Sequence, residues 1–580
     1  TFHWHLTEDQ GWRLEIERYP RLTTVGSCRA ETQVGRESDP FVGDGERYCG
    51  HYTQAEAREI VEYARERFIT VLPEIEMPGH SRAALAAYPE LACTDGPFEV
   101  GTRWGVYEDI YCPGERTFAF LEDVLTEVMA VFPSEVIHIG GDEAPKARWE
   151  ESPVAQRVIE REGLEDEEEL QGWFVARIGR FLAEHGRRLV GWDEILEGGL
   201  APDAVVMSWR GVEGGIEAVK AGLDVVMTPT SHAYFDYYQG DPEQEPLAIG
   251  GHLPLEEVYE FEPVPDALSA DEARHVLGAQ GNVWTEYMRT PEHVEYMVFP
   301  RLLAMAEVVW TPRDARDRDG FMRRLGRQLR RLDARGVNYR VPDVTGLERD
   351  RLTLDDRVVV ELRSPVPDAE IRYTLDGSEP DRDSRLYTGP LRLDVDTSGI
   401  TVAARLVLPD GRRGHIRRAR FARATLRPPA DDVAPRDLAP GLRRRYFEGE
   451  FRTVGDLRDS TLVRTDVVEG VGLKGDERAE RFGLRLTGYL RIPADGVYTF
   501  RLSSDDGAVL RIGGRTVVDH DGLHGMSARD GPVALARGLH PVELLFFQAG
   551  GGRGLRLEMA RAGREPAPIP DGWWRRRPGG

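Results

Sequence analysis

The sequence lacks the features that mark membrane, nucleic-acid-binding and zinc-binding proteins. No apolar run approaches the roughly 20 residues of a membrane span, and no signal peptide is present. Lys and Arg number 75 against 100 Asp and Glu, and the net charge of −25 argues against a nucleic-acid partner, because phosphates bind to basic faces. No Cys-x-x-Cys pair occurs among the four cysteines, so no zinc site is expected.

The cysteines all lie in loop-like segments that contain glycine or proline. Pairing in chain order, Cys28 with Cys49 and Cys93 with Cys112, would close two long surface loops and would imply an oxidising compartment. Free thiols are the alternative. The even count and the loop placement favour the disulfides, and we expect a secreted or periplasmic protein.

At 580 residues the chain is long enough for about three domains. Alternating strand-like and helix-like segments predict an α/β domain over residues 1–342, and short strands with frequent turns predict a small β domain over 343–427. A linker rich in proline, alanine and aspartate covers 428–441. Residues 442–580 read as a β-sandwich.

Seven apolar, strand-like segments alternate with helices in the first domain, as in a (β/α)₈ barrel or a doubly wound sheet. A doubly wound sheet usually has a glycine-rich phosphate turn after its first strand, and this chain has none. The chain starts at Thr1, already inside a strand-like pattern. We therefore predict a (β/α)₈ TIM barrel that lacks its first strand, with a long last helix over Pro291–Trp310, followed by two all-β domains.

One strand, over 136–140, ends in two adjacent carboxylates, Asp142 and Glu143. Gly140 and Gly141 before them let the backbone bend or approach a ligand closely. Two carboxylates with different tasks are the usual requirement for cleaving a glycosidic bond. An acidic turn at a helix N-terminus is the alternative.

Polar and aromatic residues follow nearly every strand of the predicted barrel. They are Glu8 and Asp9, Glu74 and Glu76, Asp142 and Glu143, Trp192 to Glu194, Trp209 and Arg210, His232 to Asp236, and Trp284 and Glu286. In a barrel these strand ends converge on the face that carries catalysis. Aromatic walls with acids between them suit a sugar, whose C–H faces stack on rings while its hydroxyls bind carboxylates.

Several of these segments resemble the β-N-acetylhexosaminidases of glycoside hydrolase family 20 over residues 1–310. The matching motifs are HWHLTEDQGWR at 3–13, PEIEMPGH at 73–80, HIGGDE at 138–143, GW at 191–192, SW at 208–209, YFD at 234–236 and NVWTE at 282–286. Residues 343–427 look like the C-terminal β domain of chitobiases and hexosaminidases. Residues 442–575 resemble the β-sandwich first described in anthrax protective antigen, a possible glycan-binding module.

The resemblance implies a retaining exo-glycosidase that uses substrate assistance, without a cofactor or a metal. The family's pattern makes Glu143 the general acid and base, Asp142 the partner of the 2-acetamido N–H, and Tyr234 the partner of the acetamido oxygen. The pocket walls would be Trp192, Trp209 and Trp284, and the sugar hydroxyls would bind to Asp236 and Glu286. A supporting network would consist of Glu8, His80 and His138. The expected partner is a glycan with a terminal N-acetylhexosamine.

Two departures from the family pattern stand out. Glu8 and Glu76 occupy positions where the family usually has Asp, and the family's sugar-binding Arg belongs to a strand that this chain does not contain. Two alternative functions stay open: release of a disaccharide, as by a lacto-N-biosidase, and glycan binding without catalysis. In the last domain, Asp505 and Asp506 either form a plain hairpin turn, which we favour, or bind calcium.

Overall fold

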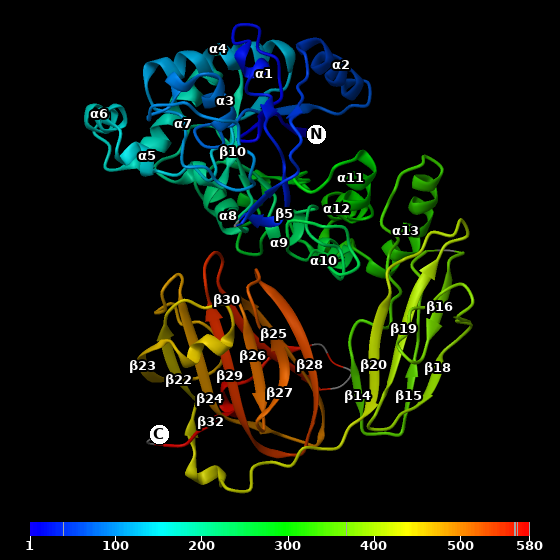
Figure 1. Ribbon diagram of the computed structural model, residues 1–580. Coiled ribbons are helices and arrows are strands. Elements are labelled where there is room, and N and C mark those ends of the chain that lie inside the picture. The colour runs from blue at the N-terminus through cyan, green and yellow to red at the C-terminus, as the bar shows by residue number, and fades with distance from the viewer. Residues whose placement is uncertain (39, 367, 562–563, 565, 579–580) are drawn as a thin grey trace. The chain divides into compact units, whose positions relative to one another are not determined.

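The computed structural model describes residues 1–38, 40–366, 368–561, 564 and 566–578 (Figure 1). Contacts divide the chain into two compact units, Thr1–Asp317 and Arg318–Gly580. Among the described residues, no helix is both long and apolar enough to cross a membrane.

The first unit is built on a sheet of seven parallel strands. In order across the sheet these are β1 (Phe2–His5), β8 (Val71–Glu74), β9 (Val136–His138), β10 (Arg188–Trp192), β11 (Val205–Ser208), β12 (Asp224–Met227) and β13 (Val276–Ala279). Every strand pairs with the next in the chain, which is the order of a (β/α)₈ barrel. In the described part of the chain β1 and β13 do not pair with each other, so the prediction of a barrel short of one strand is confirmed.

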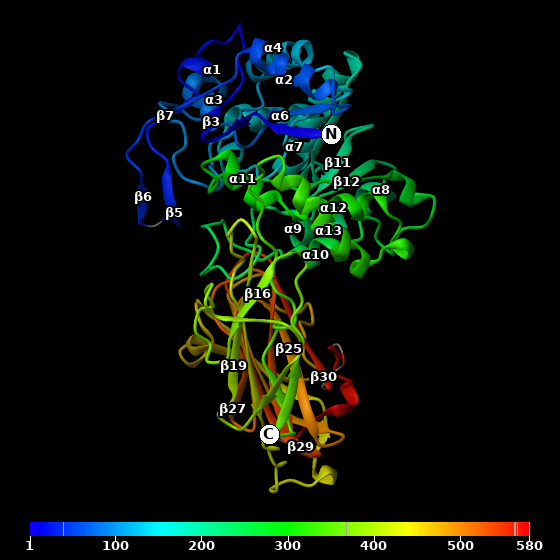
Figure 2. The same cartoon turned by 90° about the vertical axis from the view of Figure 1, so that its right-hand side faces the viewer.

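Amphipathic helices cover the outside of this sheet (Figures 1 and 2). Among them are α2 (Gln54–Arg65), α4 (Glu115–Val131), α7 (Glu167–Glu184) and α8 (Glu213–Lys220). In α4, Phe118, Leu121 and Leu125 are buried at helical spacing, and Thr53 opens α2 with a capping box to Glu56. Because each helix returns the chain to the same end of the sheet, all strands end on one face.

The prediction of one long helix over Pro291–Trp310 is wrong. The structure has α11 (Pro291–Val298) and α12 (Arg301–Trp310), separated by Phe299 and Pro300. Proline has no N–H to donate, and its ring disfavours the helical conformation of the residue before it. Phe299 is accordingly extended, with φ −100° and ψ 136°.

The predicted disulfides, Cys28–Cys49 and Cys93–Cys112, are both present. The first joins β4 (Cys28–Arg29) to β7 (Tyr48–Cys49), whose cysteines are directly opposite each other. The hairpin of β5 (Gln33–Ser38) and β6 (Phe41–Gly43) lies between these two cysteines in the chain and stands away from the helices (Figure 2). The disulfide therefore ties the base of a long surface loop.

The second unit begins with α13 (Arg318–Asp333) and continues in strands, which confirms the all-β prediction. A five-stranded sheet holds β14 (Arg351–Thr353), β20 (Arg417–Arg423), β19 (Ile400–Val407), β16 (Glu370–Thr374) and β17 (Arg385–Leu386), beside a pair of β15 (Arg357–Val360) and β18 (Leu391–Asp394). Alternate residues of β20, such as Ala419 and Phe421, are buried.

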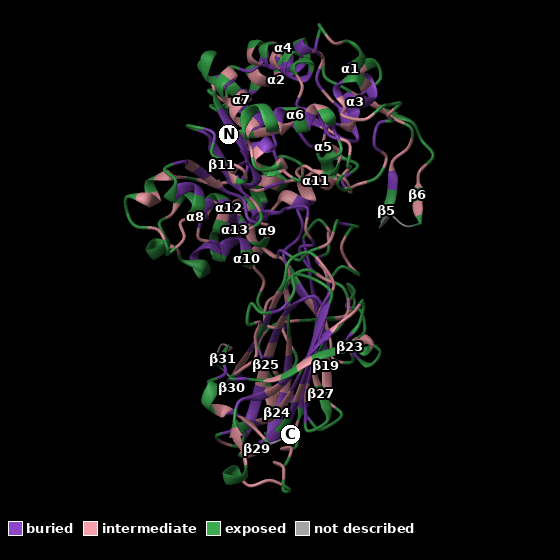
Figure 3. Cartoon of the chain, turned by 90° about the vertical axis from the view of Figure 1, so that its left-hand side faces the viewer, coloured by how far each residue is buried: buried purple, intermediate pink, exposed green. Residues whose placement is uncertain are grey.

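The remaining strands form two sheets packed as a sandwich. One contains β21 (Ala439–Pro440), β32 (Trp574–Arg576), β24 (Phe482–Ile492), β29 (Gly538–Gln548), β26 (Ala508–Ile512), β27 (Arg515–His520), β22 (Leu442–Glu448) and β23 (Thr461–Val468). The other contains β28 (Ser527–Leu535), β25 (Gly496–Asp505), β30 (Gly554–Arg561) and β31 (Ala567–Pro568). Side chains such as Phe500, Leu510 and Phe546 belong to one buried core cluster. Figure 3 colours the buried residues of these strands purple.

The expected hairpin at Asp505 and Asp506 is wrong. β25 pairs with β28 and β30, whereas β26 pairs with β27 and β29, so this turn carries the chain from one sheet to the other. Asp506 fastens the crossing, because its carboxylate accepts hydrogen bonds from the backbone N–H groups of His524 and Ala549. The pattern of short strands and turns does not distinguish such a crossing from a hairpin.

Candidate active site

Asp142 and Glu143 follow the carboxyl end of β9, after two glycines with left-handed backbones. Gly140 has φ +70° and Gly141 has φ +92°, values that residues with a Cβ rarely adopt. A Cβ on Gly140 would lie 1.7 Å from Oε2 of Glu76. The glycine pair therefore lets a buried carboxylate approach the backbone just before the two acids.

His80 faces this acid pair from the loop after β8. Its Nε2 lies 3.7 Å from Oδ2 of Asp142 and 3.6 Å from Oε2 of Glu143, and its Nδ1 lies 2.9 Å from Glu8 and 3.2 Å from Asp9. Burial alone would lower the pKa of His80, but the surrounding carboxylates raise it well above its usual value. The imidazole is thus held in its cationic form between two pairs of acids.

The two acids have different surroundings. The Asp142 side chain is 15% exposed, and burial raises its pKa to about 8, with His80 opposing the rise and the charges of Glu194 and Glu74 adding to it. The Glu143 side chain is 40% exposed and has a left-handed backbone, φ +44°. Such a conformation costs roughly 1–2 kcal/mol for a residue with a Cβ, and strained residues of this kind cluster at functional sites.

A second buried network lies deeper, around Glu74. Nδ1 of His138 and Nε2 of His3 lie 2.8 and 3.0 Å from its carboxylate oxygens, and the indole N–H of Trp192 donates to it at 2.9 Å. Burial lowers the pKa of His138 to about 4, so this histidine is neutral at physiological pH. The three neighbouring histidines, which include His5, outweigh burial and hold the pKa of Glu74 well below its usual value.

Three tryptophans from different strand ends lie together in one cluster. Trp192 is buried, its ring centroid lies 5.9 Å from that of Trp284, and both pack with Trp209 on the same apolar residues. The ring of Trp209 lies 6.4 Å from that of Tyr234. The tryptophans that the sequence analysis assigns to the pocket walls thus lie in one cluster beside Tyr234.

Tyr234, Asp236 and Glu286 complete the face. The segments that carry them run side by side, because Tyr234 pairs with Asn282 and the N–H of Phe235 donates to the Asn282 carbonyl at 2.7 Å. Burial, with the charge of Glu286, raises the pKa of Asp236 to about 8. Oδ1 of Asp236 is buried and has no partner among the described residues.

All the predicted site residues lie at or after the carboxyl ends of the barrel strands. The sequence analysis lists Glu74 among the strand-end acids without giving it a role, and it misses His3 and His5. His3 and His5 alternate along β1, as Glu74 and Glu76 do around the end of β8, and alternate residues share one face of a strand. The register places His5 beside Glu74. That alternation of polar residues in apolar strands was the available signal.

Several histidine–acid sets have the donor types of a metal site. His3, Glu74 and His138 form one, and His80, Asp142 and Glu143 form another, with donor atoms within 4.8 Å of one another. In the first set the carboxylate already accepts the indole hydrogen bond of Trp192. In the first set His3 and His138 lie at hydrogen-bonding distance from Glu74, and in the second the cationic His80 faces both acids. These contacts account for the close approach.

Comparison with known proteins places these features in context. Residues 1–313 match the family described as the glycosyl hydrolase family 20 catalytic domain, residues 353–408 the chitobiase/beta-hexosaminidase C-terminal domain, and residues 438–572 the PA14 domain. A beta-hexosaminidase of Porphyromonas gingivalis is 44% identical over 561 residues, which is 94% of this chain and 70% of that protein.

Two further relatives cover mainly the barrel. A beta-hexosaminidase of Vibrio furnissii is 39% identical over 311 residues, 53% of this chain and 51% of that protein. The crystal structure of a family 20 exo beta-N-acetylglucosaminidase from Vibrio harveyi, in complex with N-acetylglucosamine, superposes with a TM-score of 0.51 at 35% identity. That match covers 58% of this chain and 54% of the other. The chain thus spans from about half to 70% of the length of these three relatives.

Proposed function

The chain belongs to glycosyl hydrolase family 20, and on that basis we propose that it removes terminal β-linked N-acetylglucosamine or N-acetylgalactosamine from glycans, with retention of configuration. The observation that carries the proposal is the pairing of Asp142, mostly buried, with the more exposed Glu143 at the end of β9, both facing His80. Adjacent carboxyl groups in such different surroundings are suited to different tasks.

In the first step the carbonyl oxygen of the sugar's own 2-acetamido group attacks the anomeric carbon. Glu143 donates its proton to the glycosidic oxygen as that bond breaks, which leaves an oxazolinium ion. Asp142 accepts the acetamido N–H and, in its ionised form, offsets the positive charge that develops on the ring. In the second step Glu143 takes a proton from water, the water oxygen bonds to the anomeric carbon, and the oxazolinium opens to restore the acetamido group.

The remaining residues of the face bind and orient the sugar. The tryptophan cluster encloses the acetamido methyl group and one face of the ring, and the hydroxyl of Tyr234 donates to the acetamido oxygen. Asp236 and Glu286 bind ring hydroxyls. The buried, unpartnered Oδ1 of Asp236 supports this role, because such an atom costs free energy until a donor reaches it.

We extend the proposal to location and to the last domain. Two disulfides support an oxidising compartment, so we propose a secreted or periplasmic enzyme. For the C-terminal β-sandwich we propose a glycan contact through the loop after β27, where Leu523 and Met526 are exposed beside the crossing at Asp506. Weaker retention of the Leu523→Ser, Met526→Ser double variant on immobilised glycan, with unchanged hydrolysis of small substrates, is the expected result.

One assay panel tests the main proposal. The protein should release nitrophenol from β-N-acetylglucosaminide and β-N-acetylgalactosaminide, and much less from lacto-N-bioside. Preferred release from lacto-N-bioside would identify a disaccharide-releasing enzyme instead. Binding of N-acetylglucosamine without hydrolysis of any of the three would identify a glycan-binding protein, and the Asp142–Glu143 pair argues against that outcome.

A further inference from the structure

Trp209 is held by a carboxylate that the proposed chemistry does not use. Its indole Nε1 donates to Oε2 of Glu194 at 2.9 Å, and Glu194 lies in the short helix η2 (Asp193–Leu196) after the neighbouring strand, β10. The Glu194 side chain is only 10% exposed. We propose that Glu194 is a positioning residue, which fixes the plane of the Trp209 indole at the sugar pocket.

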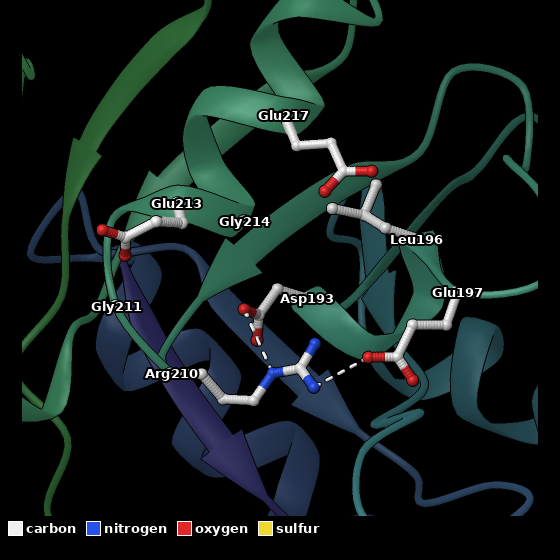
Figure 4. A pocket seen from close by; sticks show the side chains of 8 residues that line it. All are labelled: Asp193, Leu196, Glu197, Arg210, Gly211, Glu213, Gly214 and Glu217. Atoms are coloured by element: carbon white, nitrogen blue, oxygen red, sulfur yellow. Dashed lines mark hydrogen bonds and ion pairs between the residues drawn. The ribbon is translucent and has the colours of Figure 1, made fainter. Parts of the chain in front are cut away.

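Arg210, the residue after Trp209, holds the other side of this arrangement (Figure 4). Its guanidinium Nε lies 3.4 Å from Asp193 and 3.8 Å from Glu194, and its Nη1 lies 2.8 Å from Glu197. The guanidinium thus binds three acids of the η2 segment while the adjacent residue donates its indole N–H to one of them. The loop after β11 therefore contacts η2 through two directional polar interactions, the indole hydrogen bond of Trp209 and the ion pairs of Arg210.

The loop after β11 is not closely packed on the side where Arg210 lies. A cavity of about 330 Å³ lies there, lined by Asp193, Leu196, Glu197, Arg210 and the start of α8 (Figure 4). A side chain next to such a space can move unless hydrogen bonds or ion pairs restrain it. The ion pairs of Arg210, which lines the cavity, supply that restraint, and the bond to Glu194 holds the adjacent Trp209.

The neighbouring wall has the same design. Trp192 donates its indole N–H to the buried Glu74 at 2.9 Å, as Trp209 does to Glu194. Glu74 and Glu194 also both contribute to raising the pKa of Asp142. Each carboxylate thus holds one wall and lies close enough to act electrostatically on the acid proposed to bind the acetamido N–H.

This inference rests on the proposed function, and the test compares Glu194→Met with Glu194→Gln. The carboxamide oxygen of Gln still accepts the indole N–H, whereas the Met side chain, of similar size, does not. With a nitrophenyl β-N-acetylglucosaminide, Glu194→Met should lower kcat/KM about tenfold, mainly through KM, because a lost hydrogen bond is worth about one order of magnitude. Glu194→Gln should stay within about threefold of wild type.

Glu217→Gln is the matched control, because Glu217 lines the same cavity from α8 and its side chain is exposed, and it should leave KM unchanged. In a Trp209→Phe background, which lacks the N–H donor, Glu194→Met should change KM less than twofold. Melting temperatures report folding, and if Glu194→Met does not fold, Glu194→Leu, which also lacks an acceptor, replaces it in both backgrounds.

Three results would overturn the inference: unchanged KM in Glu194→Met, equal losses in Glu194→Gln and Glu194→Met, or a full effect of Glu194→Met without the indole donor. Each requires an active wild-type enzyme. An inactive wild type contradicts the proposed function itself, so the two failures are distinguishable.

Discussion

Trp192 donates its indole N–H to Glu74 at 2.9 Å, across 118 positions of the sequence. The bond joins the end of β10 to the end of β8, on either side of the strand that leads to Asp142 and Glu143. A wall of the pocket and the charge network behind the acids are therefore one hydrogen-bonded structure. A substitution at Asp142 or Glu143 therefore acts within a framework that is largely buried and hydrogen-bonded.

Replacing Glu143 with Gln tests general acid catalysis. The change should lower kcat/KM on natural glycosides by about 10²–10⁴-fold, because the glycosidic oxygen then leaves without its proton. Aryl glycosides with acidic leaving groups should lose much less in the first step. The measurement is kcat/KM over a series of leaving groups, with the exposed Glu150→Gln as control. An equal loss over the whole series would contradict the role of Glu143.

Replacing Asp142 with Asn tests substrate assistance. A thiazoline analogue of the oxazolinium ion should inhibit the wild type strongly, because it resembles the species that the site stabilises. Asp142→Asn should weaken that inhibition and slow turnover, and glycosides without the 2-acetamido group should be nearly inert. Inhibition constants and mass spectrometry provide the measurements. A sugar trapped covalently on a carboxylate would disprove the mechanism.

The parts of the site that are local in sequence were predictable. Asp142 and Glu143 stand out because two glycines and two acids interrupt an apolar strand, and the disulfides follow from an even number of cysteines in loops. The break at Pro300 was also readable, since proline interrupts helices. Helical periodicity over the whole segment outweighed that signal, and the prediction there was wrong.

Contacts between distant strand ends were not predictable in the same way. The bonds from Trp192 to Glu74 and from Trp209 to Glu194 depend on strand order and register, which one sequence does not specify. The crossing at Asp506 was not predictable for the same reason, because a turn between two strands has the same sequence pattern whether the strands pair or enter different sheets. Tertiary structure decides these cases.

The two disulfides should contribute strongly to stability. They close loops with sequence separations of 21 and 19, and closing a loop of that size stabilises a protein by about 3 kcal/mol. The Cys28→Ser, Cys49→Ser double variant should therefore unfold at a lower urea concentration than wild type. Reductant should no longer lower its urea midpoint by breaking this disulfide. The Cys93→Ser, Cys112→Ser pair is the parallel case. Unchanged midpoints in both would show that the loops are held by other contacts.

The last prediction concerns Asp236 and pH. Its pKa is raised to about 8 in the folded protein, first by burial and then by Glu286, with Arg301 opposing. An unfolded aspartate ionises near pH 4. Between about pH 4 and 8 folding therefore takes up a proton at this site, so the stability that the protonated carboxyl contributes is present below pH 4 and is lost as pH rises.

Asp236→Asn removes this dependence, because the amide stays neutral in both states. The variant should gain stability relative to wild type as pH rises from 5 to 9, by about 1–3 kcal/mol at the upper end. Its hydrolytic activity should fall, since the proposed hydroxyl contact is altered. Denaturant unfolding at several pH values measures the gap, with Asp266→Asn as control, because that side chain is 86% exposed. A gap that does not change with pH would show that Asp236 is ionised in the folded protein throughout this range.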